Sequence, residues 1–189
     1  VQLLKYAGEN GVAAYGVMMY VSMIFSGAFI GYSIGTAPIF GYNDGAQNYT
    51  ELKSLLKKSL ILVGVFALCI VVLAEVLAIP LAKIFVGYDT ELMDMTVFGF
   101  RIYALAFLFM GYAIFGSGFF TALNDGVTSA IISFLRTLVF QVGALLLLPM
   151  MLGIDGIWYS VVVAELMATV FSALFMIVKR DKYHGGEHL

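Results

Sequence analysis

Long stretches without charge divide the chain into predicted membrane spans. No residue between Asn10 and Asn43 carries a formal charge, and a soluble fold does not readily bury an uncharged run of this length. About 20 apolar residues are enough to cross a bilayer as a helix. Residues 1–8 are expected to be the end of a truncated helix, and residues 183–189 a disordered tail. Five full spans are predicted between them, at residues 12–40, 59–82, 95–123, 127–152 and 157–178.

Glycines recur regularly within the first span. Gly27, Gly31 and Gly35 are four residues apart and therefore lie in a line on one helix face. Helices in lipid gain little from burying Leu against Leu, so they approach one another closely at small residues. We therefore expect these three glycines to face another helix. The span is predicted to break near Pro38 and to end in the turn-rich residues 41–45.

The same glycines create an accidental match to a catalytic motif. Residues 31–35 read G-x-S-x-G, which in serine hydrolases places the serine on a sharp turn after a strand. Here the flanking residues form one apolar run, and the two histidines, His184 and His188, lie in the tail. No nucleophile in the sequence has a nearby base, so the chain is not expected to be an enzyme.

The connection at residues 43–58 is the one sizeable charged connection between the predicted spans. Leu52, Leu55 and Leu56 fall on one helical face, and Thr50 with Glu51 is typical of a helix N-terminus. One interpretation is a short amphipathic helix lying on the membrane surface. The other is an early start of the next spanning helix. The remaining connections are predicted turns, at residues 8–11, 87–89, 124–126 and 153–156.

Four charged residues lie within the predicted spans: Glu75, Arg101, Arg136 and Glu165. A charge at the centre of a spanning helix costs about 3 kcal/mol on insertion scales, so each should face protein or water and have a partner. Glu75 and Arg101 lie at compatible depths on consecutive spans and are expected to pair. Arg136 and Glu165 can pair only through extended side chains. Both are interpreted as structural ion pairs, with an ion or proton site as the alternative.

Composition agrees with a membrane protein. Of the 189 residues, 62% are hydrophobic and 12% charged, and the mean hydropathy is +0.99. Soluble domains are nearer one-quarter charged, so the predicted class is an all-α bundle of transmembrane helices. A net charge of −2 gives no indication of nucleic-acid binding. The single cysteine, Cys69, cannot form an internal disulfide, and no His, Cys or acid cluster has metal-binding spacing, so neither a metal nor a cofactor is expected.

Basic residues near the span ends predict the orientation, because Lys and Arg favour the cytoplasmic side. One side has six of them, Lys53, Lys57, Lys58, Lys179, Arg180 and Lys182, and the other has Lys5 and Lys83. The 43–58 connection and the C-terminal tail are therefore expected in the cytoplasm, for a multi-pass protein of the plasma (inner) membrane. Because the chain starts at Val1 without a Met or a charged leader, we expect it to be part of a longer protein.

Three segments resemble the multidrug and toxic compound extrusion (MATE) family. They are the residues Ala37-Pro38-Ile39-Phe40-Gly41-Tyr42-Asn43-Asp44-Gly45-Ala46-Gln47, Ser133-Phe134-Leu135-Arg136, and Gly153-Ile154-Asp155-Gly156-Ile157-Trp158 leading to Ala164-Glu165. The resemblance implies the C-terminal lobe of a two-lobe transporter that exports lipophilic, often cationic, compounds in exchange for Na⁺ or H⁺. The partners that it implies are lipid, small-molecule substrates and an N-terminal lobe of the same protein, and this chain alone is not expected to transport.

Spans one and three are rich in aromatic and Met side chains, which suit lipophilic cations. The resemblance implies that these spans border the substrate cavity, and the candidate cavity residues are Tyr15, Met19, Met23, Phe107 and Met110. Some family members carry an ion-binding acid midway along the helix equivalent to span three. Residues 107–112 contain none, so no coupling residue is assigned. Two alternatives stay open: a lipid-linked oligosaccharide flippase of the same superfamily, and a non-transporting membrane subunit.

Overall fold

The computed structural model describes the backbone of residues 2–179 and the side chains of residues 8–179 except that of Ile154. Every element in this part of the chain is a helix. In order they are α1 (Gln2–Gly45), α2 (Tyr49–Val86), α3 (Thr90–Ala122), α4 (Gly126–Phe134), the π-helical η1 (Leu135–Phe140), α5 (Gln141–Leu152) and α6 (Ile154–Val178). Since α4, η1 and α5 are continuous, five helical segments of the described residues are long and apolar enough to cross a membrane, as predicted. The predicted tail at 183–189 lies outside the described residues.

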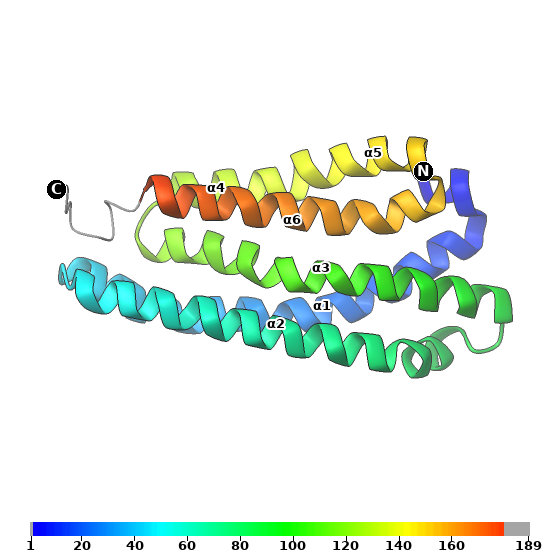
Figure 1. Ribbon diagram of the computed structural model, residues 1–189, viewed down its shortest axis with the longest axis horizontal. Coiled ribbons are helices and arrows are strands. Elements are labelled where there is room, and N and C mark those ends of the chain that lie inside the picture. Colours follow the sequence, from blue (N-terminus) through cyan, green and yellow to red (C-terminus); the bar gives the residue numbers. More distant parts are fainter. Residues whose placement is uncertain (1, 180–189) are drawn as a thin grey trace.

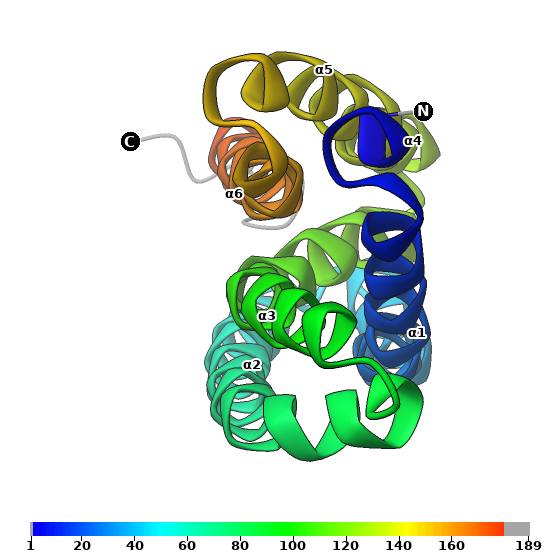
Figure 2. The ribbon, with the colours of Figure 1, turned by 90° about the vertical axis from the view of Figure 1, so that its right-hand side faces the viewer.

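The helices run side by side along the long axis of the molecule, with α3 at the centre (Figure 1). Seen end-on, α1, α2 and α3 form one group, and α6 with the α4–α5 segment covers α3 on the other side (Figure 2). Helix α3 contacts α1, α2, α4 and α6. In its most apolar stretch 56% of the residues are buried, whereas no other span exceeds 28%. The core of the bundle is therefore built around α3.

Glycines of α3 allow this close packing. A Cβ at Gly111 would lie 2.5–2.9 Å from three ring atoms of Phe29, and one at Gly99 would lie 2.8–3.0 Å from the ring of Trp158. Cβ atoms at Gly116 and Gly118 would overlap the hydroxyls of Ser172 and Ser33. Neighbouring helices thus approach α3 where it has no side chain, as expected for packing in lipid.

The glycine row of α1 was expected to do the same, but no helix of the described chain covers it. Gly27, Gly31 and Gly35 are exposed, and no atom lies within 4 Å of a Cβ built on any of them. Helix α1 packs on α3 through its opposite face, which includes the buried Phe29 and Phe40. The cause is that two small-residue faces were available, on α1 and on α3, and sequence spacing alone does not say which one the bundle uses.

Helix α1 bends at a different place from the one predicted. It continues through Pro38 to Gly45, and the Thr36 hydroxyl donates to the Tyr32 carbonyl at 2.9 Å in the turn before the proline. Spanning helices tolerate proline because neighbouring groups satisfy the freed backbone atoms. The bend lies instead at Gly8, where φ is 63° and ψ is −154°, a conformation that favours glycine. The predicted turn at 8–11 is therefore present as a kink.

The charged connection at 43–58 is not a separate surface helix. Helix α2 begins at Tyr49 and runs without interruption to Val86, and the Asn48 side chain caps it by accepting from the Glu51 N–H. Leu52 and Leu56 of the apolar face are buried. The early-start interpretation is thus the one observed, and the resulting helix of 38 residues is about 57 Å long, well beyond a hydrocarbon core of about 30 Å.

The turn at 124–126 is fixed by a capping carboxylate. Asn124 has a φ of 61°, and Asp125 accepts from both the backbone N–H and the hydroxyl of Thr128, at 3.1 and 2.7 Å. Lys179, at the end of α6, donates to the same carboxylate at 3.1 Å. One buried side chain therefore starts α4 and ties it to the C-terminal end of α6.

Candidate functional site

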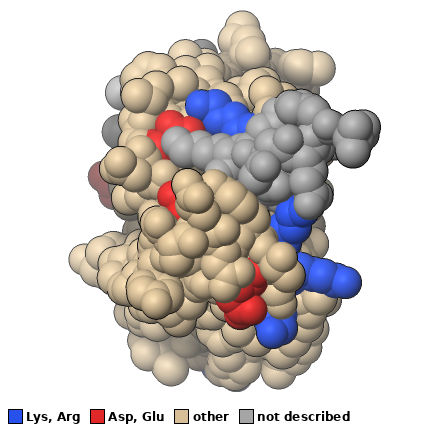
Figure 3. Space-filling model, turned by 90° about the vertical axis from the view of Figure 1, so that its left-hand side faces the viewer, with Lys and Arg blue, Asp and Glu red and all other residues tan. Residues whose placement is uncertain are grey.

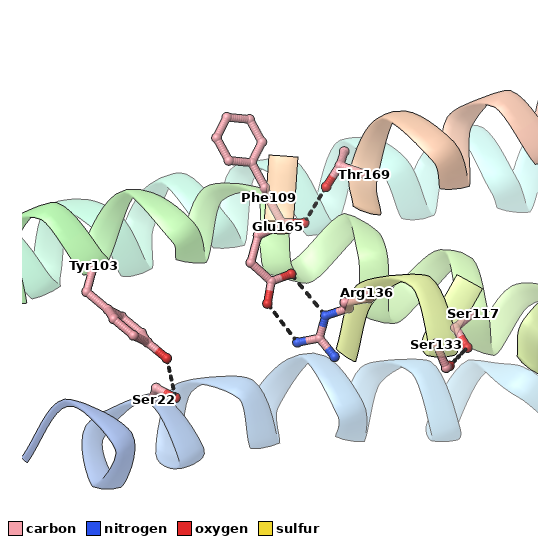
Figure 4. A network of polar contacts seen from close by, with 8 residues as sticks. All are labelled: Ser22, Tyr103, Phe109, Ser117, Ser133, Arg136, Glu165 and Thr169. Atoms are coloured by element: carbon pink, nitrogen blue, oxygen red, sulfur yellow. Dashed lines mark hydrogen bonds and ion pairs between the residues drawn. The ribbon is translucent and has the colours of Figure 1, made fainter. Parts of the chain in front are cut away.

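Arg136 and Glu165 form a bidentate ion pair deep in the bundle. Arg136 Nε donates to Glu165 Oε2 at 2.9 Å and Nη2 donates to Oε1 at 3.0 Å (Figure 4). The start of α4 and the end of α6 lie at the same end of the bundle. Counted at about 1.5 Å per residue from there, Arg136 lies about 15 Å and Glu165 about 20 Å along its span. The Glu165 side chain is 8% exposed and the Arg136 side chain 27%. The predicted pair is confirmed, and it places one carboxylate and one guanidinium at membrane depth.

The arginine is carried by an irregular helical turn. Residues Leu135–Phe140 are π-helical, with α-helix on either side. A π-turn accommodates an extra residue and shifts the side chains that follow around the helix axis. Arg136 is the second residue of this turn, so the irregularity and the ion pair occur at the same point of the fourth span. Such turns are frequent at functional sites.

A pocket lies beside the pair, between α1, α3 and the α4–η1 segment. Its volume is about 280 Å³. The lining residues are Ser26 and Ile30 from α1, Ala113, Ile114 and Ser117 from α3, and Ile132, Ser133 and Arg136 from the fourth span. We call this cavity the Arg136 pocket. It is the polar cavity of interest because it adjoins a buried charge, whereas the groove between α1 and α2 is lined by apolar side chains and Tyr32.

A connected network of hydroxyl groups includes Ser117 and Ser133, which line the Arg136 pocket. The Ser117 hydroxyl is 2.8 Å from that of Ser133 and 2.9 Å from that of Ser129, and Thr121 donates to Ser129 at 2.7 Å. Figure 4 shows Ser117 and Ser133 turned toward each other, with Ser133 on the same helical segment as Arg136. The network links α3 to α4 and supplies polar groups beside Arg136.

The candidate cavity residues do not line this pocket. Phe107 and Met110 are 0% and 4% exposed and belong to the core, so placing them in a cavity was wrong. Tyr15 is half-buried and stacks on Trp158, with ring centroids 6.3 Å apart. Met19 and Met23 are 48% and 67% exposed on the outer surface of α1. The reason is that α3, the central helix, buries its aromatic residues against neighbours on several sides.

Aromatic residues of α1 and α3 form a connected cluster. The Tyr103 ring packs edge-on against Tyr15 and Phe107, at 6.4 and 5.8 Å, and its hydroxyl donates to Ser22 at 3.4 Å. Phe25 packs edge-on against Phe107 at 5.2 Å. Edge-on geometry is the favoured arrangement of aromatic pairs, so this density of rings indicates tight packing between helices.

The second predicted ion pair is also confirmed. Arg101 Nε lies 4.0 Å from Glu75 Oε2. The two side chains are 50% and 38% exposed, so this contact is looser and wetter than the Arg136–Glu165 pair. Within the described residues, no group of three or more His, Cys, Asp or Glu side chains could hold a metal ion. The buried pair is therefore the stronger candidate for a functional role.

The pocket serines were missed by sequence reasoning. Ser26 and Ser117 lie in apolar helices, where a lone serine carries no positional signal. Ser133 lies three residues before Arg136, and side chains at this spacing share a helix face. That spacing was the one available signal that a hydroxyl accompanies the buried charge.

Comparison with known proteins identifies the family. The MatE family model matches residues 1–146 of the chain. The chain belongs to the MatE family. This confirms the resemblance seen in the sequence segments. A curated relative is the Multidrug export protein MepA of Staphylococcus aureus (strain bovine RF122 / ET3-1), which is 20% identical over 179 residues, or 95% of this chain and 39% of that protein.

Solved MatE structures share the fold. An outward-facing conformation of a multidrug resistance MATE family transporter of the MOP superfamily superposes with a TM-score of 0.90 at 20% identity, covering 97% of this chain and 41% of that one. An inward-facing conformation also gives a TM-score of 0.90 at 20% identity, covering 98% and 43%. The chain thus spans about two-fifths of the length of the proteins it matches, which agrees with one lobe.

Proposed function

We propose that this chain is one lobe of a secondary active antiporter that exports drugs or other lipophilic, often cationic, compounds in exchange for Na⁺ or H⁺. The observation that carries the proposal is membership of the MatE family together with curated relatives that are multidrug export proteins. These relatives favour drug export over the flippase and subunit alternatives. The coupling ion is proposed from the family alone, and no residue of this chain is assigned to it.

Under this proposal, the lobe moves as a rigid body during alternating access. Transporters of this kind rock two repeats against each other around a binding site at the midplane. The described lobe superposes equally well on an outward-facing and an inward-facing relative. This supports a lobe that moves as one body, with the conformational change located between lobes.

The exposed face of α1 is the surface that we expect to meet the second lobe and the substrate. It carries Tyr20 and Met23, which are 68% and 67% exposed, followed by the glycine row from Gly27 to Gly35. Aromatic and Met side chains suit lipophilic cations, and uncovered glycines suit close approach of a further helix. Met19 and Met23 therefore stay candidate cavity residues under this proposal.

We place the end of the bundle that holds the α1–α2 and α3–α4 connections in the cytoplasm of a plasma-membrane protein. Charged side chains of both signs are visible at this end of the molecule (Figure 3). Lys53, Lys57 and Lys58 in the first turns of α2 and Lys179 at the end of α6 supply the basic residues. Positive charge at span ends favours this side.

The test is an efflux assay with a cationic fluorescent dye in cells that lack their own exporters. One strain makes Val1–Leu189 alone, and the other makes the same segment joined to the sequence encoded upstream of it. We expect ion-dependent dye export only from the joined chain, because one lobe provides only one side of the cavity. Export by the segment alone would replace the lobe interpretation with a homodimeric transporter. Lack of export by the joined chain, at a normal membrane level, would contradict drug export.

A further inference from the structure

Glu165 contacts only one edge of the Arg136 guanidinium. Glu165 uses the side edge, formed by Nε and Nη2, whereas Nη1 has no hydrogen-bond partner among the described residues. In Figure 4 the guanidinium nitrogen without a dashed line points toward α1, away from Glu165. A guanidinium has five N–H donors, and the two bonds to Glu165 leave three, two on Nη1 and one on Nη2. Two of these, one on Nη1 and one on Nη2, form the end edge, which can bind a second planar acceptor.

The end edge belongs to a pocket of matching polarity. Of the residues that line the Arg136 pocket in the described chain, Arg136 is the charged one, three are serines, and none is a carboxylate. Glu165 lies behind the guanidinium and is 8% exposed. A ligand in the pocket would therefore meet the N–H side of the ion pair. A cation there would be repelled by these donors and would find no carboxylate on the pocket wall.

The hydroxyl network can add a further donor. Either oxygen can donate in the Ser117–Ser129 and Ser117–Ser133 bonds, while Thr121 donates to Ser129. If each hydroxyl donates to the next, from Thr121 through Ser129 and Ser117, the Ser133 hydrogen is left to donate. Since Ser133 and Arg136 are three residues apart on the same helix, their side chains share a face. Guanidinium and hydroxyl donors can therefore converge on one oxygen-bearing group.

We propose that the Arg136 pocket binds the carboxylate or phosphate group of an amphiphile. The end edge of Arg136 would accept two ligand oxygens in a planar, charge-assisted contact, and the Ser133 hydroxyl would donate to one of them. A cavity of about 280 Å³ has room for such a group together with the start of an alkyl chain. The source of the group is either a soluble amphiphilic anion or the headgroup of an anionic lipid. This proposal concerns equilibrium binding and goes beyond drug export, so either can fail without the other.

The test measures binding of radiolabelled octanoate to the purified protein, including the sequence encoded upstream, in nanodiscs of phosphatidylcholine. Methyl octanoate serves as the neutral competitor. Arg136→Gln/Glu165→Gln removes both charges together and keeps amide groups in their place, and Ser133→Ala removes one donor without touching the ion pair. Glu75→Gln/Arg101→Gln is the matched control, because it neutralises the ion pair that does not adjoin the pocket.

We expect saturable octanoate binding that weakens about tenfold or more in the Arg136/Glu165 double variant and about threefold in Ser133→Ala. The control should bind like the unaltered protein, and methyl octanoate should compete poorly. Adding phosphatidylglycerol to the nanodiscs separates the two sources: competition indicates a lipid headgroup, and no competition indicates a soluble anion. Absence of saturable binding, equal competition by the methyl ester, or unchanged binding in Ser133→Ala would overturn the proposal. The serine variant keeps the test decisive if the charge-neutral pair fails to fold.

Discussion

The Arg136–Glu165 pair gives the sharpest prediction, because removing one partner and removing both should have very different effects. Arg136→Gln leaves Glu165, 8% exposed, without its cation. Breaking a buried ion pair by removing one partner typically costs about 3–5 kcal/mol, since an uncompensated charge stays behind. Glu165→Gln should cost less, about 2–3 kcal/mol, because Arg136 is 27% exposed and can still reach water in its pocket.

The double variant Arg136→Gln/Glu165→Gln should be milder than the sum of its parts. It leaves no buried charge, and replacing a whole buried pair is often close to neutral. We expect a loss of about 2 kcal/mol or less, and hence a coupling energy of at least about 2 kcal/mol between the two positions. The measurement is equilibrium unfolding in mixed micelles of a mild detergent with increasing dodecyl sulfate, for all four proteins under identical conditions.

The Glu75–Arg101 pair is an internal control for this cycle. Its single contact is 4.0 Å long and its side chains are 38% and 50% exposed. Solvent-exposed pairs contribute about 0–1 kcal/mol, so the same set of glutamine variants there should show little coupling. Equal coupling at both pairs, or a loss below about 1 kcal/mol for Arg136→Gln, would refute the reasoning that burial and bidentate geometry set the magnitude.

Two further predictions test the packing and capping of the bundle. Gly111→Ala should destabilise the protein by about 1–3 kcal/mol, because its Cβ would press on the buried ring of Phe29, whereas Gly31→Ala should have no such cost within this lobe. Equal unfolding free energies for the two variants would contradict this. Asp125→Ala should cost about 1–2 kcal/mol through loss of the α4 cap. It should cost more than Asp89→Ala, because Asp89 only caps α3 through the Leu92 N–H, whereas Asp125 also accepts from Lys179 at the end of α6. The reverse order in the same unfolding assay would contradict a stabilising contact between Asp125 and Lys179.

The sequence predicted well those features that lipid imposes on any chain. An uncharged run such as 11–42 must be helical in a bilayer, since only helices and closed barrels satisfy the backbone there. Charged residues within spans must find partners, and the partners of Arg136 and Glu75 were identified from depth alone. The turn at Asn124 follows from a residue that tolerates positive φ beside an N-capping aspartate. In each case one local rule decides the outcome.

The choice of packing face could not be made from the sequence in the same way. Gly31 and Gly111 are both small residues in apolar helices, yet only Gly111 is covered by a neighbouring side chain. Phe107 and Met23 have similar apolar character, yet one is buried and the other exposed. Apolar side chains satisfy both lipid and protein contacts, so hydropathy does not separate the two environments. The arrangement of helices around α3 decides which face is covered.

Helix α1 joins the two surfaces that matter for function. Its inner face is held against α3 by Phe29 at Gly111 and by Ser33 at Gly118, while Ser26 and Ile30, one turn apart, form a wall of the Arg136 pocket. The exposed glycine row lies on the same helix, within a turn of these pocket residues. Helix α1 therefore packs against α3 through Phe29 and Ser33, lines the Arg136 pocket through Ser26 and Ile30, and leaves its glycine row uncovered within the described chain.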